Sequence, residues 1–398
     1  MKILHILTDS GVGGAGVLLE NMLTHSSLPK SCFAVVLPRG AAMAPRLSAR
    51  GFRVFPILRG ADRSLALRDL FRLVAVIRRE KPHILHTHAS LAGRIAGWLA
   101  GVPIRLATRH CAYKTKPGRH RFSAWVHRLA DKSLTTCTVA TAGAAAENLM
   151  ALGIPPEKIL LIRNGARAVP RLSGAKREEL RRQLSISEGT FVIGICARLA
   201  PVKDHMTLLR AAKLLLEEQE GYHVLIVGGG EAEAALRTAA KEMGIAAHVT
   251  FTGYAEDPAP YLNLFDVAVN CSVGTETSCL ALSEAMSLGI PCVASRFGGN
   301  TEMVREGENG LLFQEKSERE LATCLSRLKN VPALYCRLSG GARRRVLHDL
   351  RAEEMAHAYD HLYLALYDAP RPHGELHMPP KTMQKRFSPF MVAFSEKM

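Results

Sequence analysis

Long apolar runs are missing from this chain of 398 residues, although 47% of its residues are hydrophobic. No unbroken apolar stretch reaches the roughly 20 residues that a membrane-spanning helix needs. The first residues, MKILHILTDS, alternate and then break at glycines, which is typical of a buried strand and not of a secretory signal. We therefore expect a cytoplasmic protein without a spanning helix, and the length favours two domains.

Paired cysteines are missing as well. The nine cysteines are scattered from Cys32 to Cys336, and none of them forms a C-x-x-C pair. An odd number at irregular spacing indicates neither a disulfide framework nor a zinc ribbon. A reducing compartment agrees best with this pattern.

Acidic residues are scarce in one part of the first half, and the whole chain has a net charge of +16. Between His83 and Thr141 the single acid is Asp131. The cations of this segment are Arg94, Arg105, Arg109, Lys114, Lys116, Arg119, Arg121, Arg128 and Lys132. Such a surface suits an anionic partner, namely lipid headgroups, a phosphorylated substrate or nucleic acid. Because no helix-turn-helix, RNP or zinc-finger pattern is found, nucleic acid is not expected.

Short β-branched runs alternate with helical segments in both halves, which predicts an α/β fold of two doubly wound, Rossmann-like domains. The expected strands are 2–7, 33–37, 53–57, 83–88, 104–108 and 133–140, then 191–197, 222–228, 248–251, 266–271, 290–295 and 310–313. The expected parts are an N-terminal domain 1–168, a linker and entry helix 169–190, a C-terminal domain 191–350, a crossover helix 351–369 and a disordered basic tail 370–398. Ligands of such domains lie at the carboxyl ends of the strands, so we expect them in a cleft between the domains.

Glycines follow the first expected strand with the spacing G-x-G-x-x-G, at Gly11, Gly13 and Gly16. The pattern is typical of a turn that holds a dinucleotide, of a loop near another phosphorylated ligand, or of a tight turn that only packs on the sheet. A dinucleotide site needs an acid about twenty residues later. No acid occurs between Asn21 and Ala61, which weakens the interpretation as an NAD(P)-dependent oxidoreductase.

The second half carries charged residues where strands are expected to end. Arg198 and Lys203 follow the expected strand 191–197, where two cations could neutralise a diphosphate. Glu276 lies in a later loop, and Glu284 lies on the following helix, which Thr277 or Ser278 could cap. The amino end of that helix offers N–H groups to a phosphate. Each group could also be merely solvated.

Several motifs occur in a fixed order along the chain up to about residue 360. They are GGAG at 13–16, HTH at 86–88, RH at 109–110, IRNGA at 162–166, R-x4-K at 198–203, VGGG at 227–230, E-x7-E at 276–284 and GENGLLF at 307–313. In this set the chain resembles the retaining glycosyltransferases of family 4, which have the GT-B fold. The resemblance implies a nucleotide-sugar donor on the second domain, an acceptor on the first, and a C-terminal helix that crosses back to the first domain.

The resemblance also implies a role for individual residues. Arg198 and Lys203 would hold the leaving diphosphate, Glu284 would bond the ribose hydroxyls, Glu276 would face the donor sugar, and His110 would point a ring nitrogen at the sugar. The other implied donor-binding residues are Gly13, Gly14, Gly253, Tyr254, Thr277, Ser278, Cys279 and Leu280. On the acceptor side the candidates are His88, Arg109 and Lys114.

Two departures from the family pattern bear on this site. The family commonly has E-G-F-G-L where this chain has Glu276-Thr-Ser-Cys-Leu280, and VGGGE replaces the frequent G-D-G-P. His86 and His88 lie on one face of a strand, but no carboxylate or thiol accompanies them, and no D-x-D pair occurs. We therefore expect no metal and no cofactor, with protein cations holding the diphosphate.

No Ser-His-Asp set and no pair of catalytic carboxylates can be inferred from spacing. The resemblance implies front-face substitution, in which the departing phosphate helps to deprotonate the acceptor hydroxyl. The expected function is retaining transfer of a sugar from a UDP- or GDP-linked donor to a lipid-linked or polysaccharide acceptor. A nucleotide-sugar epimerase or hydrolase of the same fold is the alternative.

A basic amphipathic segment, residues 113–134, carries Phe122, Trp125, Val126 and Leu129 on one helical stripe. It suits an anionic membrane surface, and it equally suits a helix that packs on the core with a solvated basic face. Membrane association at the inner face of the membrane is therefore an expectation that the sequence leaves open. The sequence does not indicate the oligomeric state.

Overall fold

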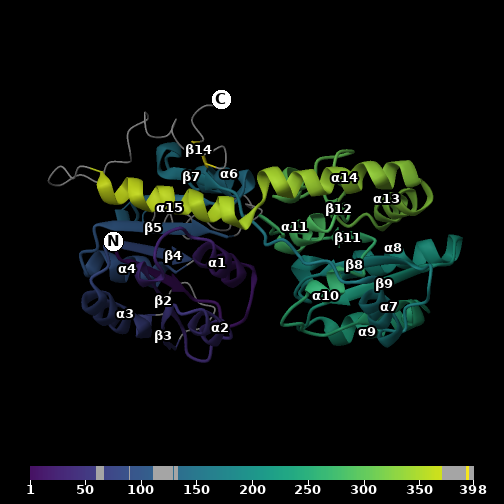
Figure 1. The fold of residues 1–398 in the computed structure, drawn as a ribbon, viewed down its shortest axis with the longest axis horizontal. Coiled ribbons are helices and arrows are strands. Elements are labelled where there is room, and N and C mark those ends of the chain that lie inside the picture. Colours follow the sequence, from purple (N-terminus) through teal and green to yellow (C-terminus); the bar gives the residue numbers. More distant parts are fainter. Residues whose placement is uncertain (60–66, 89, 111–128, 130–132, 370–390, 394–398) are drawn as a thin grey trace. The chain divides into compact units, whose positions relative to one another are not determined.

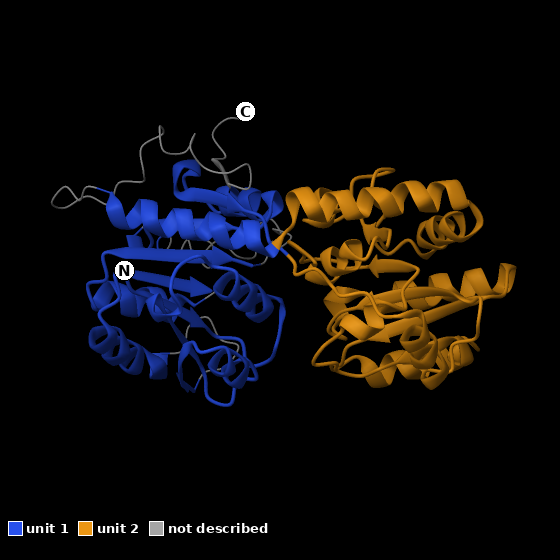
Figure 2. Cartoon of the chain, in the orientation of Figure 1, with its two compact units in different colours: residues 1–165, 352–398 blue, residues 166–351 orange. Residues whose placement is uncertain are grey.

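The computed structural model describes residues 1–59, 67–88, 90–110, 129, 133–369 and 391–393 (Figure 1). The chain divides into two compact units (Figure 2). Unit 1 contains Met1–Gly165 and Ala352–Met398, and unit 2 contains Ala166–Arg351. Each unit is a parallel sheet with helices packed against it, so the predicted fold class of two Rossmann-like α/β units is confirmed.

Unit 1 is built on a sheet with the strand order β14-β7-β6-β5-β4-β1-β2-β3. Its parallel strands are β1 (Ile3–Leu7), β2 (Phe33–Pro38), β3 (Arg53–Leu58), β4 (Ile84–His88), β5 (Ile104–Arg109), β6 (Cys137–Ala140) and β7 (Ile159–Ile162). Each strand expected in this half overlaps an observed one, whereas β7 was not expected, because a run of four apolar residues has no clear period. The backbone of β14 (Met391–Ala393) pairs antiparallel with β7, so the expected disordered tail does not describe these three residues.

The helices of unit 1 connect its strands and cover the sheet. They are α1 (Gly14–Thr24), α2 (Met43–Ala49), α3 (Leu67–Glu80), α4 (Leu91–Leu99) and α6 (Gly143–Ala151), with short 3-10 turns at Lys30–Cys32 and Pro156–Lys158. The C-terminal helix α15 (Ala352–Asp368) returns to this unit, as expected, and lies beside α1 (Figure 1). Tyr359 and Tyr363 of α15 are buried in the core of unit 1, and the Asp360 carboxylate accepts hydrogen bonds from the Ser26 hydroxyl and the Ser27 N–H.

Unit 2 repeats the same plan with the strand order β10-β9-β8-β11-β12-β13, all parallel. The strands are β8 (Phe191–Cys196), β9 (Tyr222–Val227), β10 (Val249–Phe251), β11 (Val267–Asn270), β12 (Cys292–Ser295) and β13 (Gly310–Phe313). The helices are α7 (Gly174–Gln183), α8 (His205–Glu218), α9 (Glu233–Glu242), α10 (Ala259–Leu262), α11 (Leu280–Ser287), α12 (Asn300–Met303), α13 (Glu318–Asn330) and α14 (Pro332–Asp349), with 3-10 turns η3 (Pro201–Lys203) and η4 (Ala246–His248).

Both sheets reverse their strand order at one point. The reversal lies between β1 and β4 in unit 1 and between β8 and β11 in unit 2. In open α/β sheets, ligands bind at this point, outside the carboxyl ends of the strands, because the two loops there diverge to opposite faces. The glycine loop after β1 and His88 at the end of β4 lie at this position in unit 1. Arg198, Lys203 and the Glu276 loop lie at it in unit 2.

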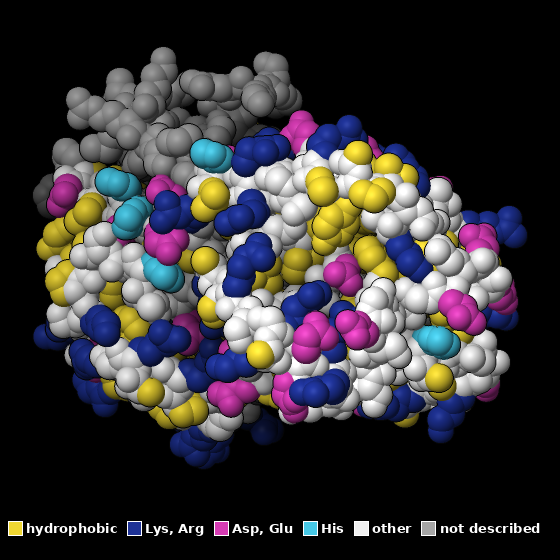
Figure 3. Space-filling model, turned by 45° about the vertical axis from the view of Figure 1, so that its right-hand side comes forward, with side chains coloured by type: hydrophobic (Ala, Val, Ile, Leu, Met, Phe, Trp, Pro, Cys, Tyr) yellow, Lys and Arg dark blue, Asp and Glu magenta, His cyan; other side chains and the backbone are white. Residues whose placement is uncertain are grey.

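On the surface of the described residues, basic and acidic side chains are intermixed. On the face drawn in Figure 3, Lys and Arg side chains are spread over the surface and acidic side chains stand among them. Among the described residues, no helix has the length and apolar character needed to cross a membrane. Lys114, most of the amphipathic segment 113–134 and most of the tail 370–398 lie outside the described residues.

Candidate active site

A run of three glycines holds the loop that carries Arg198. Gly228 and Gly230 have φ angles of +138° and +156°, which L side chains rarely adopt. A Cβ atom at either position would also overlap a carbonyl oxygen of the loop after β8, that of Ala197 or that of Leu199. The backbone N–H of Leu199 donates to the Gly229 carbonyl at 3.0 Å. The glycines therefore allow two strand-end loops to lie against each other.

The Arg198 side chain is exposed at the end of β8. Among the residues that the structure describes, no carboxylate pairs with it. A guanidinium keeps its positive charge at neutral pH, and its planar donors suit a phosphate. Arg198 thus contributes an uncompensated positive charge at the strand reversal of unit 2.

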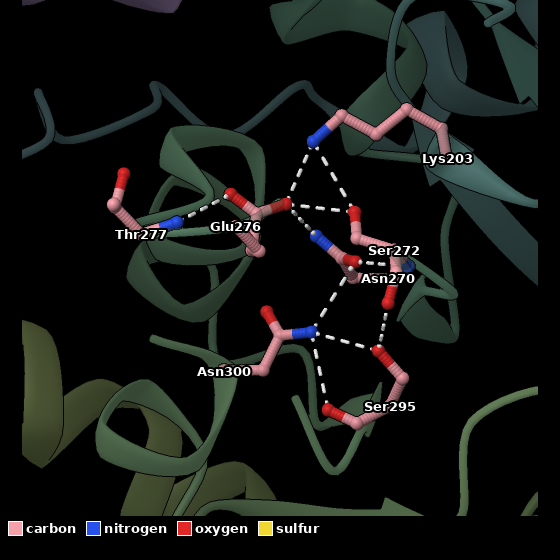
Figure 4. A network of polar contacts seen from close by, with 7 residues as sticks. All are labelled: Lys203, Asn270, Ser272, Glu276, Thr277, Ser295 and Asn300. Atoms are coloured by element: carbon pink, nitrogen blue, oxygen red, sulfur yellow. Dashed lines mark hydrogen bonds and ion pairs between the residues drawn. The ribbon is translucent and has the colours of Figure 1, made fainter. Parts of the chain in front are cut away.

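Lys203, which ends the turn η3, is held by an acid. Its Nζ atom lies 2.7 Å from Oε2 of Glu276 and 3.2 Å from Oγ of Ser272 (Figure 4). The next residue, Asp204, has a φ angle of +44° and leads into α8. The Lys203 side chain is 25% exposed, whereas that of Glu276 is 6% exposed, so the ammonium faces the surface and the carboxylate lies beneath it.

The Glu276 carboxylate is the centre of a buried network (Figure 4). Its Oε2 atom accepts hydrogen bonds from the Asn270 amide at 3.1 Å and from the Ser272 hydroxyl at 2.7 Å, in addition to Lys203. Oε1 accepts from the Thr277 backbone N–H at 3.2 Å. Burial alone would raise the pKa of Glu276, but the Lys203 ammonium and these hydrogen bonds outweigh it and hold the pKa below its usual range.

A second set of hydrogen bonds holds this network in place. The Asn300 amide donates to the side-chain oxygen and the carbonyl of Ser295, and the Ser295 hydroxyl donates to the Ser272 carbonyl at 2.7 Å. At Gly299 a Cβ atom would overlap the Thr277 carbonyl, so the backbone here approaches closer than any side chain permits. Four residues of this network were not predicted from the sequence: Asn270, Ser272, Ser295 and Asn300. A polar residue at the end of a buried strand was the available signal for Asn270 and Ser295.

Helix α11 begins without a side-chain cap. Its N-cap residue is Cys279, and among the described residues no side chain makes a capping hydrogen bond there. The expectation that Thr277 or Ser278 caps this helix was therefore wrong, because the helix begins at Leu280 and Cys279 occupies the N-cap position. Within the described part of the chain, the backbone N–H of Leu280 has no acceptor. Such N–H groups and the helix dipole favour an anion.

Glu284, one turn into α11, is buried and has a cation partner that was not predicted from the sequence. The Nε atom of Arg167 lies 3.5 Å from Glu284 Oε1, and Nη2 of the same arginine lies 2.6 Å from Asp257. Burial raises the pKa of Glu284, and the Arg167 guanidinium offsets this only in part. Two remaining donor-side candidates lie beyond β10, where Gly253 has a φ angle of +71° and Tyr254 is exposed.

The opposite pKa shifts of these two glutamates predict opposite effects of pH on stability. The lowered pKa of Glu276 contributes stability that is present above the ordinary value of 4.5 and is lost as pH falls through the lower folded-state value. The raised pKa of Glu284 has the reverse sign, because stability is lost as pH rises through the folded-state value. We expect Glu276→Gln to destabilise the chain near pH 7 and not at low pH, and Glu284→Gln to stabilise it increasingly as pH rises.

Urea unfolding of each variant between about pH 3 and pH 7 measures both effects. Each variant serves as the control for the other, since both replace a buried carboxylate by an amide of the same shape. The same pH dependence in both variants would contradict the assigned environments.

Unit 1 holds a cluster of buried histidines at its own strand reversal. Nitrogen atoms of His5, His86 and His88 lie within 4.8 Å of one another, a grouping that could hold a metal ion. His86 already contacts the hydroxyl of Tyr363 at 2.7 Å and that of Thr108 at 2.6 Å. The rings of His86 and His88 are stacked with centroids 4.5 Å apart. A metal ion would have to replace these hydrogen bonds, and stacked rings do not direct their lone pairs to a common point.

The other predicted site residues of unit 1 follow β1 and β5. His110 follows β5, and its Nε2 atom lies 3.0 Å from Nδ1 of His88. The buried Nε atom of Arg109 has no hydrogen-bond partner among the described residues. Gly13 is the N-cap of α1 and Gly14 its first residue, and neither φ angle nor packing requires a glycine at Gly14. Open space beside Gly14 is compatible with the close approach of a ligand.

The structure thus brings Lys203 and Glu276 into direct contact and brings His88 and His110 into direct contact. Two Rossmann-like units, each with polar groups at the reversal of its strand order, define the GT-B class of α/β proteins. Two sequence profiles match the chain: "Glycosyl transferases group 1" over residues 176–345 and "Glycosyltransferase Family 4" over residues 12–168. The chain belongs to the glycosyltransferases.

Relatives and solved structures agree with this assignment. The chain is 30% identical over 312 residues to a D-inositol 3-phosphate glycosyltransferase of Thermomonospora curvata, which covers 68% of this chain and 70% of the relative. It is 26% identical over 328 residues to the UDP-Gal:alpha-D-GlcNAc-diphosphoundecaprenol alpha-1,3-galactosyltransferase of Escherichia coli, with 80% and 84% covered. The structure of Anabaena HepE in complex with UDP-glucose superposes with a TM-score of 0.81 at 20% identity, covering 92% of this chain and 99% of that one.

Proposed function

We propose that this protein transfers a sugar from a UDP-linked donor to a hydroxyl group of a lipid-linked saccharide. The observation that carries the proposal is the juxtaposition of charges in unit 2. Lys203 is hydrogen-bonded to the buried Glu276. Arg198 follows the same strand as Lys203, β8, and is exposed. Cations and helix N–H groups fixed at one place stabilise the negative charge that develops on a leaving diphosphate. A GDP-linked donor would use the same contacts, and the UDP-dependent relative and the UDP-glucose complex favour UDP.

The proposed reaction retains the anomeric configuration and uses no metal ion. In such a reaction the bond from the anomeric carbon to the diphosphate breaks while the acceptor oxygen bonds to the same face, and the acceptor proton passes to the leaving phosphate. The chain then needs only to orient the two substrates and to stabilise charge. An α-linked product is named for the E. coli relative. The Lys203 and Arg198 side chains would take the place of a divalent cation.

The proposed acceptor follows from the same relative, which acts on a saccharide joined to diphosphoundecaprenol. A lipid-linked acceptor places the enzyme at the inner face of a membrane, where cations on unit 1 would interact with anionic headgroups. Arg109 belongs to the acceptor side in this proposal, whereas His88 is buried, is bonded to His5 and His110, and does not touch the acceptor. Elongation of a cell-surface polysaccharide or lipopolysaccharide is the corresponding process.

The proposal is tested by incubating the full chain with UDP-galactose, UDP-glucose or GDP-mannose and a lipid-linked N-acetylglucosamine acceptor. We expect one UDP released for each sugar transferred, an α-linkage in the product by ¹H NMR, and undiminished turnover after treatment with a chelator. Release of UDP with free sugar and no extended acceptor would identify a hydrolase instead. A β-linked product from an α-linked donor would contradict retention.

A further inference from the structure

Three histidines of unit 1 form a continuous row of hydrogen bonds, called here the histidine row. His5 lies on β1, His88 ends β4, and His110 follows β5. Nδ1 of His5 lies 3.2 Å from Nε2 of His88, and Nδ1 of His88 lies 3.0 Å from Nε2 of His110. The histidine row runs from the core of the sheet to His110, the residue that the family resemblance places beside the donor sugar.

All three imidazoles are neutral near pH 7. Burial lowers the pKa of His5 to about 3 and that of His110 to about 4, and the pKa of His88 lies well below its ordinary value for the same reason. A neutral imidazole has one N–H and one lone pair. The N–H groups of the histidine row must therefore all donate in the same direction, either from His5 toward His110 or from His110 toward His5.

The His5 end of the histidine row decides the direction in which its hydrogen bonds are donated. Nε2 of His5 is buried and has no hydrogen-bond partner among the residues that the structure describes. If the bonds ran toward His5, this atom would carry a proton with no acceptor, and buried N–H groups without an acceptor are rare. If they run toward His110, the atom has only an unused lone pair, which folded proteins tolerate more readily.

We propose that His5 and His88 fix His110 in the tautomer that carries its proton on Nδ1. His88 then donates from its own Nδ1 to Nε2 of His110, which leaves His110 a hydrogen-bond donor. His110 would hold an oxygen of the donor sugar through Nδ1–H and would not remove a proton from the acceptor. His5 and His88 act as positioning residues. This last step rests on the proposed function, whereas the tautomer does not.

The tautomer is measured directly by long-range ¹H–¹⁵N NMR spectra of the full chain labelled with ¹⁵N-histidine. His110→Gln identifies the His110 signals by their disappearance. We expect a protonated Nδ1 and an unprotonated Nε2 for His110, with no substrate present. The reverse pattern would overturn the proposal, and the result does not depend on whether the chain transfers sugar.

Two variants at one position test the functional consequence. The amide nitrogen of His88→Asn lies close to the place of Nδ1 and preserves the donor to His110, whereas His88→Leu removes it. We expect His88→Leu to lower kcat by about 10²-fold with little change in KM for the donor, and His88→Asn to restore most of this loss. Equal loss in both variants, at equal melting temperatures, would assign His88 a packing role and contradict the proposal.

Failure of the two proposals can be told apart. If the wild-type chain transferred no sugar from any donor tested, the proposed function would fail, and the NMR spectra would still decide the tautomer. If the wild-type chain is active and both His88 variants keep full activity, the positioning role fails while the proposed function stands.

Discussion

Arg198→Ala is expected to lower kcat for sugar transfer by about 10²–10³-fold without changing the melting temperature. The side chain is exposed and pairs with no carboxylate within the described ranges, so its removal leaves no buried group without a partner. In the proposed reaction its charge acts on the bound diphosphate, which gains further negative charge as its bond to the sugar breaks. Steady-state kinetics with saturating acceptor, together with thermal unfolding, measures both quantities.

Two further variants sharpen this expectation. Arg198→Lys keeps the charge and loses the planar fork of donors, so we expect an intermediate rate. Arg210→Ala removes an exposed arginine from α8 of the same unit and serves as the matched control, with an unchanged rate expected. Equal rates for Arg198→Ala and Arg210→Ala would remove Arg198 from the site.

Lys203→Ala is expected to lower kcat by about 10³-fold and, unlike Arg198→Ala, to destabilise the protein by about 3 kcal/mol. The structural reason is the 2.7 Å contact with Glu276, whose carboxylate is buried and would lose its cation. Breaking a buried ion pair leaves an uncompensated charge in a medium of low polarity. Chemical unfolding and steady-state kinetics on the same preparation separate the two effects.

The double variant Lys203→Ala with Glu276→Gln distinguishes two roles for Lys203. If the lysine both neutralises Glu276 and binds the diphosphate, the double variant should recover stability and stay inactive. A double-mutant cycle gives the coupling energy between the two side chains. Recovery of activity together with stability would show that Lys203 serves only to neutralise Glu276.

Much of the fold could be predicted because strands and helices alternate with regular spacing. Every strand expected from an apolar run overlaps an observed strand, and the basic and acidic loops were expected at strand ends. The position of Lys203 and Glu276 at one strand reversal follows from that topology, since parallel strands end on one edge. Two described strands were missed: β7, because four apolar residues have no recognisable period, and β14, which lies in the tail expected to be disordered.

The partners of the charged residues could not be predicted, because they come from distant parts of the sequence. Arg167 contacts Glu284, which is more than a hundred positions away in the sequence, and Asn300 supports the Glu276 network from the start of α12. The cap of α11 was mispredicted for a different reason. Thr277 and Ser278 have suitable side chains for a cap, but the helix begins at Leu280, which places Cys279 at the N-cap position.

His5 shows the same limit most clearly. A single histidine inside an apolar strand is ordinarily a core residue, and its sequence position gives no sign of a link to His110. The link requires the order of β1, β4 and β5 in the sheet, which brings the three side chains together in sequence-distant pairs.

The most direct test of the central claim is a crystal structure of the full chain with UDP. We expect the diphosphate at the carboxyl ends of β8 and β11, with phosphate oxygens within hydrogen-bond distance of Arg198 and Lys203 and near the first N–H groups of α11. A diphosphate bound elsewhere, with both cations directed into solvent, would contradict the proposed site.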